Sequence, residues 1–242
     1  MEAAADSVVQ ASPIGADILE QVTVRRSDVA ELGRLAVDRT DRLGEVARRL
    51  VARPFGEAVL AVVDGAPRWA ERDGRALRVE VEGREVRVPP ALAAVLPSVI
   101  THLARNAVAH GVERPDERVA AGKPEVATLR LAAAPLGTGV EILVSDDGRG
   151  LDPAALLRAA SALGLSDIDA RSAALRSGVT TATGSDLAGR GVGLGAAVDE
   201  LASAGYFLEL LDRPGGGVEV RIRAAALTPG AVAGTLPARE SP

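Results

Sequence analysis

Cysteine is absent from this chain of 242 residues, and aromatic residues make up only 2% of it. The lack of cysteine excludes disulfide bonds, thiolate zinc sites and cysteine nucleophiles, and it suits a reducing compartment. Because aromatic rings are scarce, a core must be built from Ala, Val, Leu and Ile. Hydrophobic residues reach 47% of the chain, so a sizeable aliphatic core is expected.

Lysine and histidine are also scarce. Lys123 is the only lysine, and His102 and His110 are the only histidines. The formal net charge of −5 provides no global positive field, so no binding to nucleic acid is expected. We interpret the preference for arginine over lysine as a matter of genome composition rather than of function.

Membrane and secretion signals are not visible in the sequence. The first residues, MEAAADSVVQASPIGADILE, lack a basic segment followed by an apolar one, which a signal peptide needs. No apolar run approaches the roughly 20 residues that span a bilayer. The expectation is a cytoplasmic protein without membrane contact.

Composition divides the chain into four segments. Residues 1–21 and 226–242 are rich in small and polar residues, or in Pro, Gly and Ala, and are predicted to be disordered. Residues 22–52 are predicted to be helical, because apolar residues recur at heptad positions from Val29 to Leu50. This helix either packs on its own domain or pairs with a second copy. Residues 53–225 form the main domain.

The first part of the main domain is predicted to hold a helix and a hairpin. Residues 53–74 have a helical pattern that is broken near Gly65 and Pro67. Residues 76–90 alternate as two strands about Gly83, which indicates a hairpin.

Further strands and helices follow the long helix described below. Residues 128–135 and 140–146 are predicted strands, and residues 152–188 hold short helices and a polar connection. Another helix opens within residues 189–202, and residues 206–224 form a closing hairpin. The predicted fold class is α/β, a two-layer sandwich of helices on a mixed, largely antiparallel sheet.

A long helix from Ala91 to Gly111 carries an unusual polar stripe. Within HLARNAVAHG, steps of four residues bring His102, Asn106 and His110 close to one face of the helix. Pro97 is expected to kink this helix or to mark its true first turn. Gly111 is expected to end it.

Two glycine-rich motifs follow the polar stripe: DDGRG at 146–150 and GRGVG at 189–193. Each is weak alone, since Asp and Gly dominate ordinary turns. The second motif has a degenerate match to a dinucleotide-binding fingerprint, but it follows the polar stretch TTATGSDLA rather than a strand, so we reject a Rossmann fold. A zinc site from His102, His110, Asp146 and Asp147 is conceivable, but it explains neither the glycines nor Asn106. The order of the three features is more informative than any one of them.

Three stretches in this order resemble the ATP-binding domain of sensor histidine kinases, within the GHKL superfamily (Bergerat fold) shared with gyrase, Hsp90 and MutL. They are HLARNAVAHGVERPDERVAAGKP, VSDDGRGLD and AGRGVGLGAAV. The likeness is greatest to CheA-type chemotaxis kinases, because the first stretch is long and ends in GKP. It begins near RRLVARPFGEAV and runs to about Ile222.

The resemblance implies a Mg-ATP site. Asn106 would be the Mg²⁺ ligand, His102 the catalytic residue beside the γ-phosphate, and Asp146 the acceptor of a hydrogen bond from the adenine amino group. Residues 151–188 would be the flexible lid. The implied ATP-binding residues are Arg105, Asn106, His110, Asp146, Gly148, Gly150, Thr181, Gly189, Gly191 and Gly193.

The function implied is that of a protein histidine kinase module. It would transfer the γ-phosphate in trans to a histidine on a separate phosphotransfer domain, with a response regulator downstream and residues 22–52 pairing two copies. A nucleotide-binding scaffold with little or no catalysis is the alternative. An ATPase of the gyrase or MutL kind is disfavoured, because those enzymes use a Glu as base where this stripe has His102. Departures from the family pattern fall at the stripe's edge and in the lid, not at the core motifs: Ala109, Leu175, Ser177, Val179 and Ala188.

Overall fold

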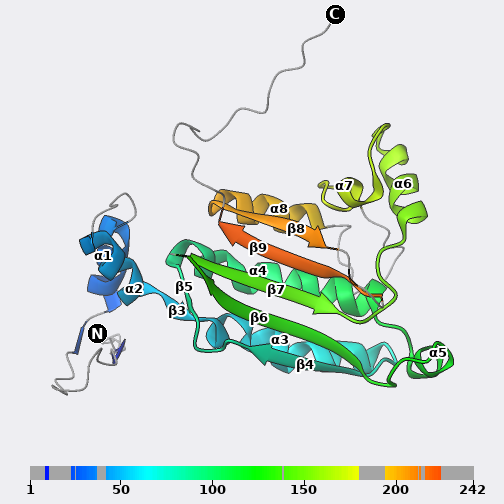
Figure 1. The fold of residues 1–242 in the computed structure, drawn as a ribbon, viewed down its shortest axis with the longest axis horizontal. Helices are drawn as coiled ribbons and strands as arrows, with labels where there is room; N and C mark the ends of the chain where they lie inside the picture. Colours follow the sequence, from blue (N-terminus) through cyan, green and yellow to red (C-terminus); the bar gives the residue numbers. More distant parts are fainter. Residues whose placement is uncertain are drawn as a thin grey trace, which may run out of the picture.

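The computed structural model describes residues 9–10, 23–24, 26–36, 42–137, 139–179, 194–211, 213 and 216–224. A five-stranded sheet forms the centre of the domain (Figure 1). Strands β4 (Leu77–Glu82) and β6 (Ala127–Leu136) are parallel, and the other three neighbouring pairs are antiparallel. The predicted α/β class with a mixed, largely antiparallel sheet is thereby confirmed. Across the sheet the strands are β4 (Leu77–Glu82), β6 (Ala127–Leu136), β7 (Gly139–Asp146), β9 (Glu219–Ala224) and β8 (Tyr206–Leu211).

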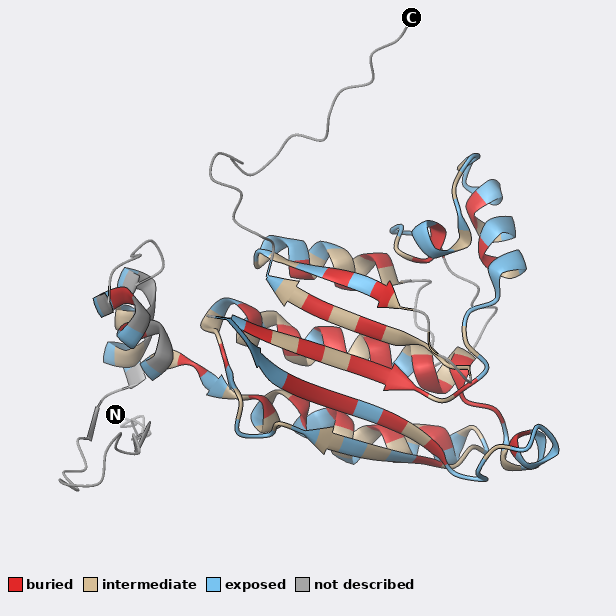
Figure 2. Cartoon of the chain, viewed as in Figure 1, coloured by how far each residue is buried: buried red, intermediate tan, exposed pale blue. Residues whose placement is uncertain are grey.

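Three helices cover one face of this sheet: α3 (Phe55–Arg72), α4 (Pro90–Asn106) and α8 (Leu194–Ser203). Strand residues alternate between buried and more exposed classes, because one face packs on the helices and the other faces solvent (Figure 2). The buried core is aliphatic, as predicted, and Phe55 is its only aromatic member among the described residues. Fully buried members include Leu92, Leu96, Ile100, Leu129, Leu131, Ile142 and Ile222.

Smaller elements surround this sandwich. The described helices among them are α1 (Arg26–Ala36), α2 (Arg42–Val51), α5 (Pro115–Ala120), α6 (Pro153–Ala162) and α7 (Ala170–Ala174). Two short antiparallel pairs are β1 (Val9–Gln10) with β2 (Thr23–Val24), and β3 (Arg53–Pro54) with β5 (Arg87–Val88). The heptad pattern predicted between Val29 and Leu50 falls on α1 and α2, which contact each other. Residues 37–41 between them lie outside the described residues.

The hairpin predicted at residues 76–90 is wrong. Strand β4 pairs with β6 in parallel, whereas β5 pairs with β3. After the turn at Gly83 (φ 68°), the chain is bound by the start of α3. There the backbone N–H groups of Phe55 and Gly56 donate to the carbonyl groups of Val86 and Arg84, both at 2.9 Å. A non-local segment therefore takes the hydrogen bonds that a hairpin would use.

Helix α3 is unbroken, which contradicts the break predicted near Gly65 and Pro67. Its buried face, which includes Val62, Ala66 and Ala70, packs in the core and outweighs the missing backbone donor of the proline. Gly65 leaves room for the Trp69 side chain, because a Cβ at Gly65 would lie 2.6 Å from the Trp69 ring.

Helix α4 begins at Pro90, so Pro97 lies inside it rather than in its first turn. Among the described residues, the segment Pro90–Gly111 is the one helix long and apolar enough, by length and composition, to cross a membrane. This finding corrects the prediction that no apolar run approaches that length. The core helix of a globular domain can have the same length and composition, and α4 packs its buried residues in the aliphatic core.

Candidate functional site

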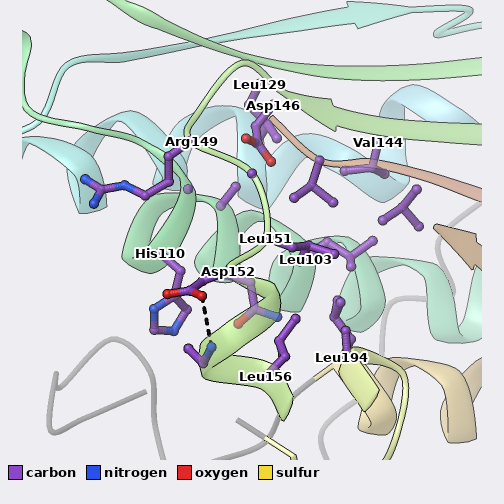
Figure 3. A pocket seen from close by; sticks show the side chains of 18 of the residues that line it. Leu103, His110, Leu129, Val144, Asp146, Arg149, Leu151, Asp152, Leu156 and Leu194 are labelled. Atoms are coloured by element: carbon purple, nitrogen blue, oxygen red, sulfur yellow. Dashed lines mark hydrogen bonds between the residues drawn. The ribbon is translucent and has the colours of Figure 1, made fainter. Parts of the chain in front are cut away.

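A cavity of about 300 Å³ lies at one end of the sheet, beside the carboxyl-terminal end of α4 (Figure 3). Its walls are mostly aliphatic and carry a few polar groups, which is typical of sites for small organic ligands. The polar or charged residues in its lining are Asn106, His110, Asp146, Arg149 and Asp152. The apolar lining includes Leu103, Leu129, Val144, Leu151, Leu156, Val179, Leu194, Val218 and Val220.

Asp146 is the last residue of β7 and lies on the helix-facing side of the sheet. Strand alternation explains this position, since Val144 two residues earlier is also buried on that side. The residue is only 4% exposed, and burial raises the pKa of its carboxyl group. Hydrogen bonds from the backbone of Gly148 and Val218 oppose this rise. Asp146 therefore supplies a buried acceptor in the cavity wall.

The loop after β7 packs tightly against its neighbours. The Gly148 N–H donates to Asp146 Oδ1 at 2.9 Å, and the Arg149 N–H donates to the Gly111 carbonyl at 2.8 Å. A Cβ at Gly148 would lie 2.3 Å from the Gly111 carbonyl oxygen, and one at Gly217 would lie 1.9 Å from the Asp146 carbonyl oxygen. These two glycines are therefore required by close backbone contacts around Asp146.

Asn106 is the last residue of α4 and lines the cavity. A π-helical turn, Ala107–Gly111, follows it, and the Val112 N–H donates to the Ala107 carbonyl at 2.8 Å. The helical segment thus ends at Gly111, as predicted, but the wider turn displaces His110 from a strict α-helical stripe. Among the described residues, no group forms a hydrogen bond with the Asn106 carboxamide.

His110 lines the cavity and is half-buried, beside the Arg75 side chain. Burial lowers the pKa of its imidazole, and the positive charge of Arg75 lowers it further. Arg75 is held in place because its Nη1 donates to the Val108 carbonyl at 2.7 Å and to Asp73 Oδ2 at 3.1 Å. Both effects favour the neutral imidazole over the charged one.

We expect an NMR titration of the free protein to give His110 a pKa below 6.5, its ordinary value. Because the folded-state pKa is lowered, the stability that depends on neutral His110 is fully present above about pH 6.5 and is lost as the pH falls through the folded pKa. His110→Gln should weaken this pH dependence in thermal unfolding. With only two histidines in the chain, His102→Gln assigns the signals. A His110 pKa at or above 6.5 would contradict the expectation.

Three of the predicted site residues that the structure describes lie outside the cavity lining: His102, Arg105 and Gly148. The Arg105 guanidinium forms a cation–π contact with Trp69 of α3, 5.2 Å from the centre of the ring. His102 precedes Asn106 by four residues on α4, and the cavity lining does not include it. Gly150 does line the cavity and has a φ of 84°, which favours glycine. The remaining predicted residues lie outside the described part of the chain: Thr181, Gly189, Gly191 and Gly193.

The segment assigned to the lid includes α6 and α7, which are capped by Asp152 and Asp169. Three departures from the family pattern lie in the described part of this segment: Leu175, which follows α7, Ser177 and Val179. Val179 is buried in the cavity wall, and the Ser177 hydroxyl donates to Asp199 of α8. The described part of this segment is therefore linked to α8 through Ser177.

Sequence reasoning missed a charged cluster behind the loop after β7. Glu113, Arg118, Lys123 and Asp147 are joined there by ion pairs of 2.7 to 3.1 Å. The signal that could have indicated it is Lys123 itself, the only lysine in an arginine-rich chain, within the GKP of the first motif. Charge type alone, however, does not reveal its partners.

A metal site made of acidic and histidine side chains has no support in the described residues. They contain no group of three or more His, Cys, Asp or Glu side chains placed to hold an ion. The zinc alternative from His102, His110, Asp146 and Asp147 therefore loses its basis within the described chain.

Comparisons with known proteins agree on one family. The chain is 34% identical over 153 residues to the chemotaxis protein CheA of Klebsiella aerogenes, covering 60% of this chain and 24% of that protein. It is also 34% identical over 157 residues to CheA of Rhizobium meliloti, covering 61% of this chain and 21% of that protein. The chain thus spans under a quarter of the length of these relatives. No protein-family model matches it.

Among solved structures, the catalytic domain of histidine kinase ThkA aligns with 70% of this chain and 90% of its own, at 13% identity and a TM-score of 0.47. The sequence matches to CheA extend well beyond the short motifs. The cavity between α4 and the end of β7 brings together Asn106 and Asp146, which those motifs carry. The domain in this chain is an ATP-binding (GHKL) domain of the CheA-type histidine kinase family.

Proposed function

We propose that this domain binds Mg-ATP and transfers the γ-phosphate in trans to a histidine on a separate phosphotransfer domain. The observation that carries the proposal is the presence of Asp146 and Asn106 in one aliphatic cavity of a CheA-type domain. The first is a buried acceptor for a base, and the second is an unpartnered oxygen ligand among the described residues. Phosphoryl transfer depends mainly on such positioning and on charge neutralisation.

Adenine is the base that suits the cavity. Leu129 and Val144 provide apolar contacts for a flat ring, and the Asp146 carboxylate accepts from the amino group of adenine. Guanine presents a carbonyl oxygen at the corresponding ring position, which an acceptor would repel. A buried acceptor left without a donor is costly, so the pocket should prefer ATP over GTP.

A magnesium ion suits the Asn106 carboxamide oxygen, because Mg²⁺ takes oxygen ligands and is commonly held by one or two protein groups together with substrate phosphates. When bound, the ion neutralises part of the roughly fourfold negative charge of ATP. Asn106 would hold it, and the neutral His110 would lie near the phosphates without repelling the metal.

His102 is proposed as the general base or orienting residue beside the γ-phosphate. Arg105 is proposed as a phosphate contact, which would require it to leave the ring of Trp69. Backbone N–H groups of the glycine motif are proposed to bind phosphate oxygens, as such groups do at helix N-termini. The residues assigned to this part of the site are Thr181, Gly189, Gly191 and Gly193.

Incubated alone with ATP, the chain is expected to acquire no phosphohistidine. His102 and His110 are its only histidines, and both belong to the segment that carries Asn106. A phosphoacceptor must approach the γ-phosphate from outside the pocket, in line with the bond that breaks. Neither residue can form part of the nucleotide site and be that incoming nucleophile at once.

Labelled ATP tests both halves of this proposal. The isolated chain should stay unlabelled, and histidine-bearing phosphotransfer domains added to it should gain acid-labile, base-stable label. His102→Gln should abolish that transfer while retaining ATP binding. Label mapped to His102 or His110 of the chain itself would contradict the assignment of the site.

A nucleotide-binding scaffold is the second candidate. The observation that favours it is the altered sequence within the lid segment, where Val179 is buried and the Ser177 hydroxyl donates a hydrogen bond to Asp199. ATP binding without transfer to any phosphotransfer domain would support the scaffold over the kinase.

Two protein partners are proposed beyond the phosphotransfer domain. A response regulator would act downstream of the labelled histidine. A second copy of the chain would pair through residues 22–52, because α2 exposes a row of apolar side chains. Leu43, Val46 and Leu50 are 59%, 42% and 55% exposed. Burying such a row between copies is favourable.

A further inference from the structure

Lys123 connects two parts of the chain that surround the nucleotide cavity. Its Nζ donates to Glu113 Oε1 at 2.7 Å, to the Gly148 carbonyl at 2.8 Å and to the Asp147 carbonyl at 3.1 Å. An ammonium group has three donors and no acceptor, so these three partners use its full capacity. The only lysine of the chain thus binds the loop after β7.

Arg118 reinforces the same loop. Its side chain is fully buried, and Nη1 lies 3.0 Å from Glu113 Oε2, while Nη2 lies 3.1 Å from Asp147 Oδ2. Asp147 in turn accepts from the Thr128 N–H of β6 at 3.0 Å. The cluster contains two cations and two carboxylates, so its charges balance, and its partners determine the position of the backbone at Asp147 and Gly148.

Gly148 links this cluster to the cavity. Its N–H donates to Asp146 Oδ1, and its C=O accepts from Lys123. Lys123 is not among the residues that line the cavity, and its contacts to the Asp147 and Gly148 carbonyls connect it to the loop that carries Asp146. We infer that Lys123 is a positioning residue, which holds the Asp147–Gly148 backbone so that the Asp146 carboxylate is oriented toward the adenine ring. The inference rests on the proposed function for the identity of the ligand.

Lys123→Met tests it, because methionine keeps an unbranched side chain of similar length and removes all three donors. ATP affinity should fall by about tenfold, the amount associated with losing a charge-assisted hydrogen bond. The preference for ATP over GTP should fall with it. Lys123→Arg keeps a cation with several donors and should restore part of both.

Arg223→Met is the matched control. Arg223 is a partly buried cation that pairs with Glu141 on the sheet, so its loss removes a comparable ion pair away from the cavity. It should lower thermal stability without changing ATP affinity. If Lys123→Met likewise lowers only stability and the folded protein binds ATP as the wild type does, Lys123 is structural and the inference is wrong.

A double-mutant cycle, measured as ATP affinity, tests whether Lys123 affects ATP binding through Asp146. If Lys123 acts through Asp146, the variant carrying both Lys123→Met and Asp146→Asn should bind ATP about as weakly as Asp146→Asn alone. Losses that add in full would show a route that bypasses Asp146 and would overturn the inference. A wild-type protein that binds no ATP at all would instead contradict the proposed function, so the two failures are distinguishable.

Discussion

Asn106→Ala is expected to abolish the magnesium dependence of ATP binding and to leave the fold intact. The carboxamide has no hydrogen-bond partner among the described residues, so its removal breaks no hydrogen bond there. Alanine also has the highest helix propensity, and Asn106 ends α4. The expected loss therefore comes from the missing oxygen ligand of Mg²⁺. Calorimetric titration of ATP with and without Mg²⁺ should give two equal, weak affinities.

Asn106→Asp is the matched variant for this test. It retains an oxygen ligand at the same position and should retain a response to magnesium. Thermal unfolding of both variants should resemble that of the wild type. Undiminished affinity and undiminished magnesium dependence in Asn106→Ala would remove the basis for assigning the metal to this residue.

Asp146→Asn is expected to weaken ATP binding by about tenfold or more and to make the protein more stable. An asparagine can turn a donor toward the adenine amino group, so a charge-assisted hydrogen bond of roughly 1.5–3 kcal/mol is lost. The preference for ATP over GTP should shrink in the same titrations. Unchanged affinity and preference would show that Asp146 does not contact the base.

The gain in stability follows from the raised pKa of Asp146. A raised folded-state pKa means that ionisation of the buried carboxyl destabilises the folded protein. The stability associated with the protonated group is therefore lost as the pH rises through the folded pKa. The neutral asparagine avoids this loss. The melting temperature of Asp146→Asn should therefore exceed that of the wild type at neutral pH, and the difference should vanish below the ordinary carboxyl value of 3.8.

Asp169→Asn provides a control, because the pKa of Asp169 is lowered whereas that of Asp146 is raised. Asp169 is exposed at the start of α7, and hydrogen bonds from Ser172 lower the pKa of its carboxyl. Its contribution to stability is present above the unfolded pKa and is lost as the pH falls through the folded pKa. This variant should gain no stability at neutral pH. A similar gain in both variants would mean that burial of Asp146 is not the cause.

Local patterns in the sequence determined much of the fold. Alternation predicted the strands around residues 128–135 and 140–146, and helical periodicity predicted the helix that ends at Gly111. Both patterns depend on neighbouring residues in one element, which is why they can be seen without the fold. Asp146 could be placed at the end of a strand for the same reason, and the order of the motifs indicated the family.

Pairing partners were decided only by the tertiary structure. Residues 76–90 contain two strands, as predicted, but β4 pairs with β6 and β5 pairs with β3. Likewise, Pro67 and Gly65 indicate a break, yet burial of the surrounding face keeps α3 continuous. In both cases contacts with distant segments contribute more than the local preference.

Contacts between distant segments also determined which residues come together at the site. Asn106 and Asp146 line the same cavity because α4 and β7 lie in adjacent layers, whereas Arg105, next to Asn106 in sequence, contacts Trp69. Lys123 lies 25 residues from Gly148 along the chain, and only the fold brings its ammonium to that carbonyl. A sequence records which groups are present and how they repeat along an element. Which donor reaches which acceptor depends on the packing of elements distant in the chain, and only the tertiary structure determines it.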